Sequence, residues 1–326
     1  MSIPSKPRVL IVRAIFPEVL ARLEQFFAVE SNQADTVWSP TELAHRLQGQ
    51  QGALTTGSDR IDPALLAGCP ALQICANMAV GTNNFDLAAM AASGVAATNT
   101  PDVLTETTAD FGFALMMATA RRISEAEAYL RAGQWTKWGH DLLAGSDIHG
   151  ATLGILGMGR IGQGIAQRGA LGFGMKVMYH NRSRLSSELE AACRARYVSK
   201  EELLQSADHL VLVLPYSAAS HHAIGAAELA QMKPTATLVN IARGGIVDDA
   251  ALAQALKGGQ IAAAGLDVFE GEPGVHPDLL SLPNVVLTPH IASASLSTRL
   301  AMANLAADNL LAFFAGQPLL TPVSAG

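Results

Sequence analysis

The 326-residue chain has only three cysteines, Cys69, Cys75 and Cys193. An odd number of cysteines without the spacing of metal ligands argues against a disulfide framework and against a zinc site. We therefore expect buried, reduced and unreactive thiols in a cytoplasmic protein.

Charge and long apolar runs are also scarce. Charged residues make up 15% of the chain and the formal net charge is −6, which gives no indication of a nucleic-acid partner. Residues 1–7 have no apolar signal core, and no uninterrupted apolar stretch has membrane length with suitable flanks. The hydrophobic content of 49% is ample for large cores, and the length suits two domains.

Short apolar runs alternate with helical patterns, which predicts α/β architecture with parallel sheets and right-handed crossovers. In the first lobe, which ends near residues 99–101, the expected strands are residues 8–12, 52–55, 72–76 and 95–98. In the second lobe they are residues 152–156, 175–179, 210–214, 236–240, 262–266 and 285–287.

The order of these patterns predicts a nested domain layout. A helical stretch over residues 104–132 leads away from the first lobe, and a final helix over 296–314 should return to it. We expect one domain of residues 1–99 and 288–326. A second, Rossmann-like domain of residues 100–287 would include a helical arm, residues 104–150.

A glycine-rich turn, Gly157-Met158-Gly159-Arg160-Ile161-Gly162, follows an apolar strand and opens a helix. In this setting Gly157 permits the tight turn, Gly159 leaves room for a pyrophosphate and Gly162 lets the helix pack against the strand. The helix N-terminus offers free N–H groups to the phosphates. We interpret this turn as a dinucleotide-binding loop; the alternative is a glycine turn in another α/β protein.

The end of the second strand of this unit indicates which dinucleotide. NAD-binding units usually have an acid about 20 residues past the last glycine to hold the ribose 2′-OH. Here the segment His180-Asn181-Arg182-Ser183-Arg184 contains no acid. Two arginines, an amide and a hydroxyl suit a 2′-phosphate, so NADP(H) is the expected cofactor, with NAD(H) as the alternative. A solvated basic turn would look the same.

Four polar patches follow predicted strands, where parallel sheets bind ligands. Each has a simpler interpretation as well: Arg243 as a surface arginine, residues 267–272 as a solvated acidic loop, His290 as a packing histidine and residues 77–84 as an ordinary loop. An anion would suit Arg243, and a histidine near an acid can be held in one tautomer with its charged form favoured. No spaced Cys/His cluster accompanies His290, so we expect no metal in this centre.

Together these patches resemble the D-isomer-specific 2-hydroxyacid dehydrogenase family over nearly the whole chain. The resemblance rests on GMGRIG (157–162), NIARGGIVDD (240–249), AAGLDVFEGEP (263–273), TPHIASAS (288–295) and AVGTNNFD (79–86). TPDVLTETTAD (100–110), AGQWTKW (132–138) and HNRSR (180–184) are most similar to bacterial glyoxylate/hydroxypyruvate reductases that also reduce 2-ketogluconate.

The resemblance implies catalytic roles for three residues. His290 matches the general acid/base, Glu272 the acid behind it, and Arg243 the arginine that binds the substrate. Protonated His290 would then give a proton to the carbonyl oxygen of a 2-keto acid while the cofactor delivers hydride, in a cleft between lobes that closes to exclude water.

The resemblance also implies a substrate-binding domain of residues 1–99 and 288–326, a cofactor-binding domain of residues 100–287, and a homodimer formed through the arm of residues 104–150. Backbone N–H groups of Val80 and Gly81 would hold the substrate carboxylate, with Ser293 and Trp138 as further substrate contacts. Beyond the glycine turn and residues 180–184, the expected cofactor contacts are Arg160, Ile161, Thr108, Pro215, Ile241 and Asp267.

Two alternatives of other kinds stay open. A dehydrogenase of the formate or phosphite type would share the cofactor domain, and a nicotinamide-sensing corepressor-like protein could keep the same residues without turnover. A purely structural Rossmann protein is disfavoured by four separate polar patches at strand ends.

Overall fold

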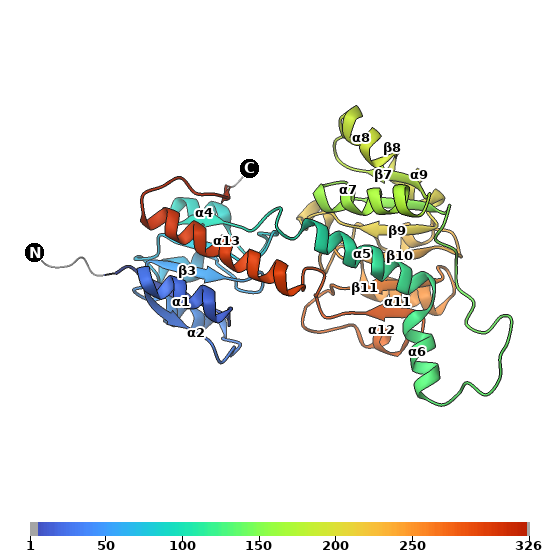
Figure 1. Cartoon of the computed structure of the whole chain (residues 1–326), viewed down its shortest axis with the longest axis horizontal. Coiled ribbons are helices and arrows are strands. Elements are labelled where there is room, and N and C mark those ends of the chain that lie inside the picture. The colour runs from blue at the N-terminus through green and yellow to red at the C-terminus, as the bar shows by residue number, and fades with distance from the viewer. Residues whose placement is uncertain (1–5, 325–326) are drawn as a thin grey trace, which may run out of the picture. The chain divides into compact units, whose positions relative to one another are not determined.

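The computed structural model describes residues 6–324, which divide into two compact units (Figure 1). Unit 1 comprises residues up to Leu104 and from Ser295 onward, and unit 2 is the segment Thr105–Ala294 between them. The cofactor-domain pattern is therefore nested within the other, as the sequence predicts. The divisions fall a few residues beyond the expected positions 99 and 287, because α5 begins at Thr105 and the segment up to Ala294 belongs to unit 2.

Unit 1 is built on a six-stranded sheet with the order β13-β5-β4-β3-β1-β2. Its strands are β1 (Arg8–Ile11), β2 (Ala28–Ser31), β3 (Gly52–Thr55), β4 (Ile74–Asn77), β5 (Ala96–Thr98) and β13 (Pro322–Val323). Its helices are α1 (Pro17–Phe26), α2 (Pro40–Leu47), α3 (Pro63–Ala67), α4 (Leu87–Ala92) and α13 (Leu296–Phe314). All pairs are parallel except β13 with β5, an antiparallel edge that the sequence pattern does not indicate.

Unit 2 contains a seven-stranded, fully parallel sheet with the order β12-β11-β10-β9-β6-β7-β8. Its strands are β6 (Thr152–Leu156), β7 (Lys176–His180), β8 (Ala195–Tyr197), β9 (His209–Leu212), β10 (Thr237–Asn240), β11 (Ala263–Leu266) and β12 (Val285–Leu287). Its helices are α5 (Thr105–Ala120), α6 (Ile123–Arg131), α7 (Arg160–Gln167), α8 (Ser187–Cys193), α9 (Lys200–Ser206), α10 (Ala226–Leu229), α11 (Asp249–Lys257) and α12 (Pro277–Ser281). A short π-helix, η1 (Arg168–Gly172), extends α7, and a 3₁₀ turn, η2 (Ala218–Ser220), follows β9.

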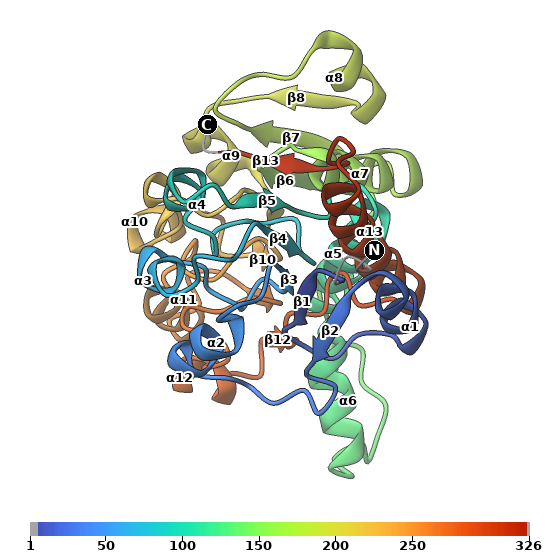
Figure 2. The same cartoon turned by 90° about the vertical axis from the view of Figure 1, so that its left-hand side faces the viewer.

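The alternation of side chains along each strand supplies two cores per sheet. In β9, Leu210 and Leu212 face the core made with α9, α10, α11 and α12, while Val211 faces the core made with α5 and α7. In unit 1, Leu10 packs with α2, α3 and α4, whereas its neighbours on β1 pack with α1 and α13. Figure 2 shows α13 beside the unit 1 strands, and α13 contacts β3 and β4. Both sheets are covered on both faces, which explains why their central strands are almost wholly apolar. The edge strands β2 and β8 each contain a charged residue and no buried residue.

Helix starts follow local chemistry. Seven helices have a serine or an aspartate at the N-cap, and the side chain of that residue accepts a hydrogen bond from a backbone N–H of the first turn. These N-cap residues are Ser39, Asp62, Asp86, Ser186, Ser199, Asp248 and Ser295. Proline occupies the first turn of α1, α2, α3 and α12, where its missing N–H costs no hydrogen bond.

The prediction of one helical stretch over residues 104–132 is wrong in one respect, because the structure has two helices there, α5 and α6. Arg122 adopts a left-handed backbone conformation (φ 53°) between α5 and α6. The sequence contains no proline or glycine at this point, so the break carries no local signal. None of the helices within residues 6–324 is long and apolar enough to cross a membrane.

Candidate active site

The turn after β6 has the shape that a pyrophosphate requires. Gly157 has φ 102°, and a Cβ there would lie 2.6 Å from the backbone nitrogen of Leu214. A Cβ at Gly162 would lie 2.4 Å from the Gly157 carbonyl oxygen, whereas one at Gly159 would meet nothing within 4 Å. The turn is therefore closely packed at Gly157 and Gly162. At Gly159, beside the N-terminus of α7, it is open and fits a dinucleotide phosphate.

His180 ends β7 in a fixed orientation. Its Nδ1 lies 2.9 Å from the Val198 carbonyl oxygen, and its ring stacks on Tyr197 with centroids 5.7 Å apart. Because a carbonyl oxygen can only accept, Nδ1 carries the proton and Nε2 is left for a ligand. The neighbouring Asn181 accepts the backbone N–H of Met158 at 2.7 Å, which joins this segment to the glycine turn.

Of the two arginines that the sequence offers to a phosphate, Arg184 has an acidic partner. Its Nε and Nη2 donate to Glu190 at 2.9 and 2.7 Å. The hydrogen bonds from Arg184 and from Tyr179 hold the pKa of Glu190 below its usual value. Residues 180–184 themselves contain no acid, but Glu190 of α8 competes with a phosphate for Arg184. Arg182 and Ser183 are exposed.

The predicted catalytic residues follow three adjacent strands of unit 2. Arg243 comes after β10, Glu272 after β11 and His290 after β12. His290 Nδ1 lies 2.8 Å from Glu272 Oε2, while Glu272 Oε1 accepts the backbone N–H of Phe269 at 2.9 Å. The pairing occupies Nδ1 of His290, and His290 itself has a left-handed backbone (φ 52°).

The charges of this group are coupled. Burial raises the pKa of Glu272, but the hydrogen bonds from His290 and Phe269 and the charges of His290 and Arg243 outweigh it and hold the pKa below its usual value. Burial lowers the pKa of Arg243, and Glu272 counters part of that effect. Glu272 is thus ionised across the neutral range beside a histidine and an arginine.

Asp267 fixes the loop that carries His290. It is fully buried, and its Oδ1 accepts the Thr288 hydroxyl and the Ile291 N–H, both at 2.8 Å. Its Oδ2 accepts the Ala292 N–H at 2.9 Å. Burial raises the pKa of Asp267, and these three donors together with His290 oppose the rise. The carboxylate that the resemblance assigns to the cofactor site is thus also the anchor of residues 288–292.

The other predicted residues of unit 2 fall into buried and exposed groups. Thr108 and Ile241 are buried, and the Thr108 hydroxyl oxygen has no hydrogen-bond partner within residues 6–324. Pro215 and Arg160 are exposed, and Ile161 and Ser293 are intermediate. Trp138 is 70% exposed in the segment after α6.

In unit 1, the loop with Val80 and Gly81 follows β4. Asn99 Nδ2 donates to the Val80 carbonyl at 2.8 Å, and Asn77 Nδ2 donates to the Gly81 carbonyl at 3.1 Å. The two carbonyls are thus turned toward the unit's own asparagines. The contact of their N–H groups with a substrate carboxylate stays a prediction.

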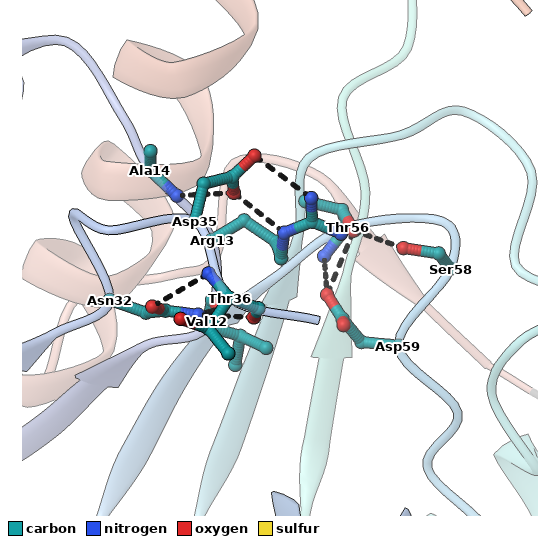
Figure 3. Close-up of polar contacts among 9 residues, drawn as sticks. All are labelled: Val12, Arg13, Ala14, Asn32, Asp35, Thr36, Thr56, Ser58 and Asp59. Carbon is teal, nitrogen blue, oxygen red and sulfur yellow. Dashed lines mark hydrogen bonds and ion pairs between the residues drawn. The ribbon is translucent and has the colours of Figure 1, made fainter. Parts of the chain in front are cut away.

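A polar cluster at the same edge of unit 1 has no counterpart in the sequence reasoning (Figure 3). Arg13 binds Asp35 through Nε and Nη2 at 2.7 and 3.0 Å, and Asp59 accepts the N–H and hydroxyl of Thr56 at 2.7 and 2.8 Å. Asn84 donates to the Thr56 and Asp59 carbonyls, which ties this turn to the loop that contains Val80. These side chains come from three separate strand ends, so no contiguous motif reveals them.

Comparison with known proteins gives the family. Residues 113–292 match the model for the D-isomer specific 2-hydroxyacid dehydrogenase, NAD binding domain. A glyoxylate reductase of Thermococcus onnurineus (strain NA1) is 46% identical over 316 residues, which cover 96% of this chain and 94% of that protein. The chain belongs to the D-isomer specific 2-hydroxyacid dehydrogenase family and is an NAD(P)-dependent oxidoreductase that reduces keto acids.

Solved structures are similar throughout. An NADPH-dependent glyoxylate/hydroxypyruvate reductase from Sinorhizobium meliloti, in complex with NADP and malonate, has a TM-score of 0.85 at 38% identity. The match covers 98% of this chain and 97% of that one. A glyoxylate reductase from Paecilomyes thermophila has a TM-score of 0.88 at 32% identity and covers 98% and 99% of the two chains.

The hydrogen bonds of Asp267 to residues 288–292 can be tested by substitution. Asp267→Asn keeps the size of the side chain but replaces one carboxylate oxygen by an amide NH₂, which cannot accept a hydrogen bond from the donors that face it. The substitution should therefore lower the free energy of unfolding by about 1–3 kcal/mol. Turnover should fall as well, because the His290 loop loses its anchor. Thr288→Val removes one donor only and should have the smaller effect on both. Denaturant unfolding and initial rates check this; full stability and turnover in Asp267→Asn would contradict it.

Proposed function

We propose that this enzyme reduces small 2-keto acids, glyoxylate and hydroxypyruvate foremost, to D-2-hydroxy acids, with NADPH preferred over NADH. The observation that carries the proposal is the paired His290 and Glu272 beside Arg243, at the carboxyl edge of the sheet that bears the glycine turn. 2-Ketogluconate shares the keto-carboxylate with these substrates and is a further candidate.

The proposed chemistry uses each residue at a stated atom. The nicotinamide ring, when bound, supplies the hydride to the carbonyl carbon of the substrate. As the C=O π bond breaks, its electron pair goes to the oxygen, which takes the proton from His290 Nε2. Glu272 orients the ring through Nδ1 and favours its charged form. Arg243 binds the carboxylate and polarises the carbonyl, and the N–H groups of Val80 and Gly81 are the proposed contacts of the other carboxylate oxygen.

The cofactor residues support NADPH without excluding NADH. The proposed contacts of the adenosine ribose are Arg182, Ser183 and the Nε2 of His180. Neutral His180 can accept a ribose hydroxyl through Nε2, and the protonated ring can donate to a 2′-phosphate instead. Thr108, whose hydroxyl has no partner within residues 6–324, is a proposed contact of the cofactor. We propose that this reaction uses no metal ion.

The test of the proposed function is a substrate panel. NADPH and NADH oxidation is measured with glyoxylate, hydroxypyruvate, pyruvate and 2-ketogluconate, and the reverse reaction with formate and phosphite. We expect the highest kcat/KM with glyoxylate or hydroxypyruvate and NADPH. Oxidation of formate or phosphite in place of keto-acid reduction would reassign the enzyme, and binding of cofactor without turnover would indicate a sensor.

One prediction of the proposed function concerns the proton that His290 donates to the substrate. If His290 is the acid, reduction should weaken as pH rises and the imidazolium is lost. Glu272→Gln should move this limb to lower pH, because it removes the carboxylate that favours the imidazolium. His290→Ala should lose roughly 10²–10⁴-fold in kcat. Rate profiles between pH 5 and 9 check this, and near-normal turnover of His290→Ala would assign the acid elsewhere.

A second prediction concerns cofactor choice. Arg182→Ala should lose one charged hydrogen bond, worth about 1.5–3 kcal/mol, to the 2′-phosphate. This amounts to roughly a ten- to hundredfold lower kcat/KM for NADPH. NADH use should hardly change. Arg196→Ala, which removes an exposed arginine bound to Glu202, is the matched control. Equal kcat/KM for NADPH and NADH in the unmodified enzyme would refute the preference.

A homodimer through residues 104–150 is part of the proposal. Helix α6 has no buried residue, and Ile123, Leu130, Trp135 and Trp138 are each more than half exposed. Apolar residues gathered on one exposed segment are typical of a subunit interface. Light scattering at micromolar concentration should give twice the chain mass of 34.1 kDa. A monomer at that concentration would refute the interface.

A further inference from the structure

A second cluster of chemically capable side chains lies on loops of unit 2 that the proposed reaction does not use. His221 and His222 follow η2, and Glu270 follows β11. One ligand atom from each of the three lies within 4.8 Å of the others. We propose that His221, His222 and Glu270 bind a divalent transition-metal ion of the Zn²⁺, Co²⁺ or Ni²⁺ type.

The donor set and spacing fit such an ion. Imidazole nitrogen and carboxylate oxygen bind these metals at about 2.0–2.2 Å, so two donors on one tetrahedral ion lie about 3.3–3.5 Å apart. His222 Nε2 lies 3.1 and 3.2 Å from the two Glu270 oxygens. A shift of a few tenths of an ångström, which the exposed Glu270 side chain can make, converts this hydrogen bond into two metal bonds.

His221 completes the set after a ring rotation. Its ring stacks on His222 with centroids 3.9 Å apart and planes at 22°, and its Nδ1 lies 3.2 Å from the Tyr216 hydroxyl. Nearly parallel rings cannot both direct lone pairs at one ion. His221 is exposed, so its side chain can rotate toward the ion without loss of core packing.

Polar contacts hold His222 between two carboxylates in this structure. His222 Nε2 and Glu270 share a hydrogen bond, and Asp248 Oδ2 lies 3.9 Å from His222 Nδ1 on the other side. Binding of a metal ion at Nε2 requires the ring proton to lie on Nδ1, the side that faces Asp248. The two carboxylates around His222 add negative charge that favours a cation.

The metal would join loops that also carry the predicted catalytic residues. The His222 N–H donates to the Gly245 carbonyl at 2.7 Å, and the Glu270 N–H donates to Asp249 at 3.0 Å. Gly245 is two residues from Arg243, and Glu270 is two residues from Glu272. An ion bound only by the folded chain should therefore stabilise these loops and raise the melting temperature.

The experiment is a Co²⁺ titration of the metal-free, full-length enzyme, followed by visible absorption and by the melting temperature with Zn²⁺. We expect one ion per chain in the unmodified enzyme. His222→Gln and Glu270→Gln should each weaken binding at least about tenfold, the lower end of the cost of losing even an outer partner of a metal ligand. His45→Gln removes an exposed histidine of α2 in unit 1 and should leave binding unchanged.

Three outcomes would overturn the proposal: no Co²⁺ uptake at millimolar concentration, unchanged affinity in both His222→Gln and Glu270→Gln, or loss of binding in His290→Ala alone. The last result would place the ion at the His290 and Glu272 pair. Circular dichroism establishes that each variant is folded. If His222→Gln does not fold, His221→Gln replaces it, because its exposed side chain is not part of the core.

Discussion

The buried carboxylate of Asp267 is the constraint on which the site depends. It stands at the end of β11 and accepts three hydrogen bonds from residues 288–292. Because the loop after β12 is fastened in this way, His290 meets Glu272, which follows the same strand as Asp267. The buried acid thus sets the position of the exposed acid and base, and its burial cost is offset by N–H and O–H donors.

The parallel sheet explains why distant residues meet. Strands β10, β11 and β12 are neighbours, so the segments after their carboxyl ends bring Arg243, Glu272 and His290 to one edge. The same edge carries the glycine turn after β6 and His180 at the end of β7. The proposed phosphate contacts, cofactor selection and proton transfer therefore all belong to one sheet edge.

Much of this could be predicted from the sequence because each signal is local. The apolar runs gave most strands within two residues, and the final helix, residues 296–314, has the expected bounds. The glycine turn and the motifs around Arg243, Glu272 and His290 were contiguous. The break at Arg122, the edge strand β13 and the partners Arg184–Glu190, Arg13–Asp35 and His222–Glu270 were missed, because tertiary packing decides them and no short pattern encodes them.

The central claim is that unit 2 carries a D-specific keto-acid reductase centre. The most direct measurement is the reduction of hydroxypyruvate with NADPH that carries deuterium at both C4 positions, followed by chiral analysis and mass spectrometry of the product. The account predicts D-glycerate with one deuterium at C2, formed in step with NADPH oxidation. L-glycerate, a racemate, or product without the deuterium would contradict it.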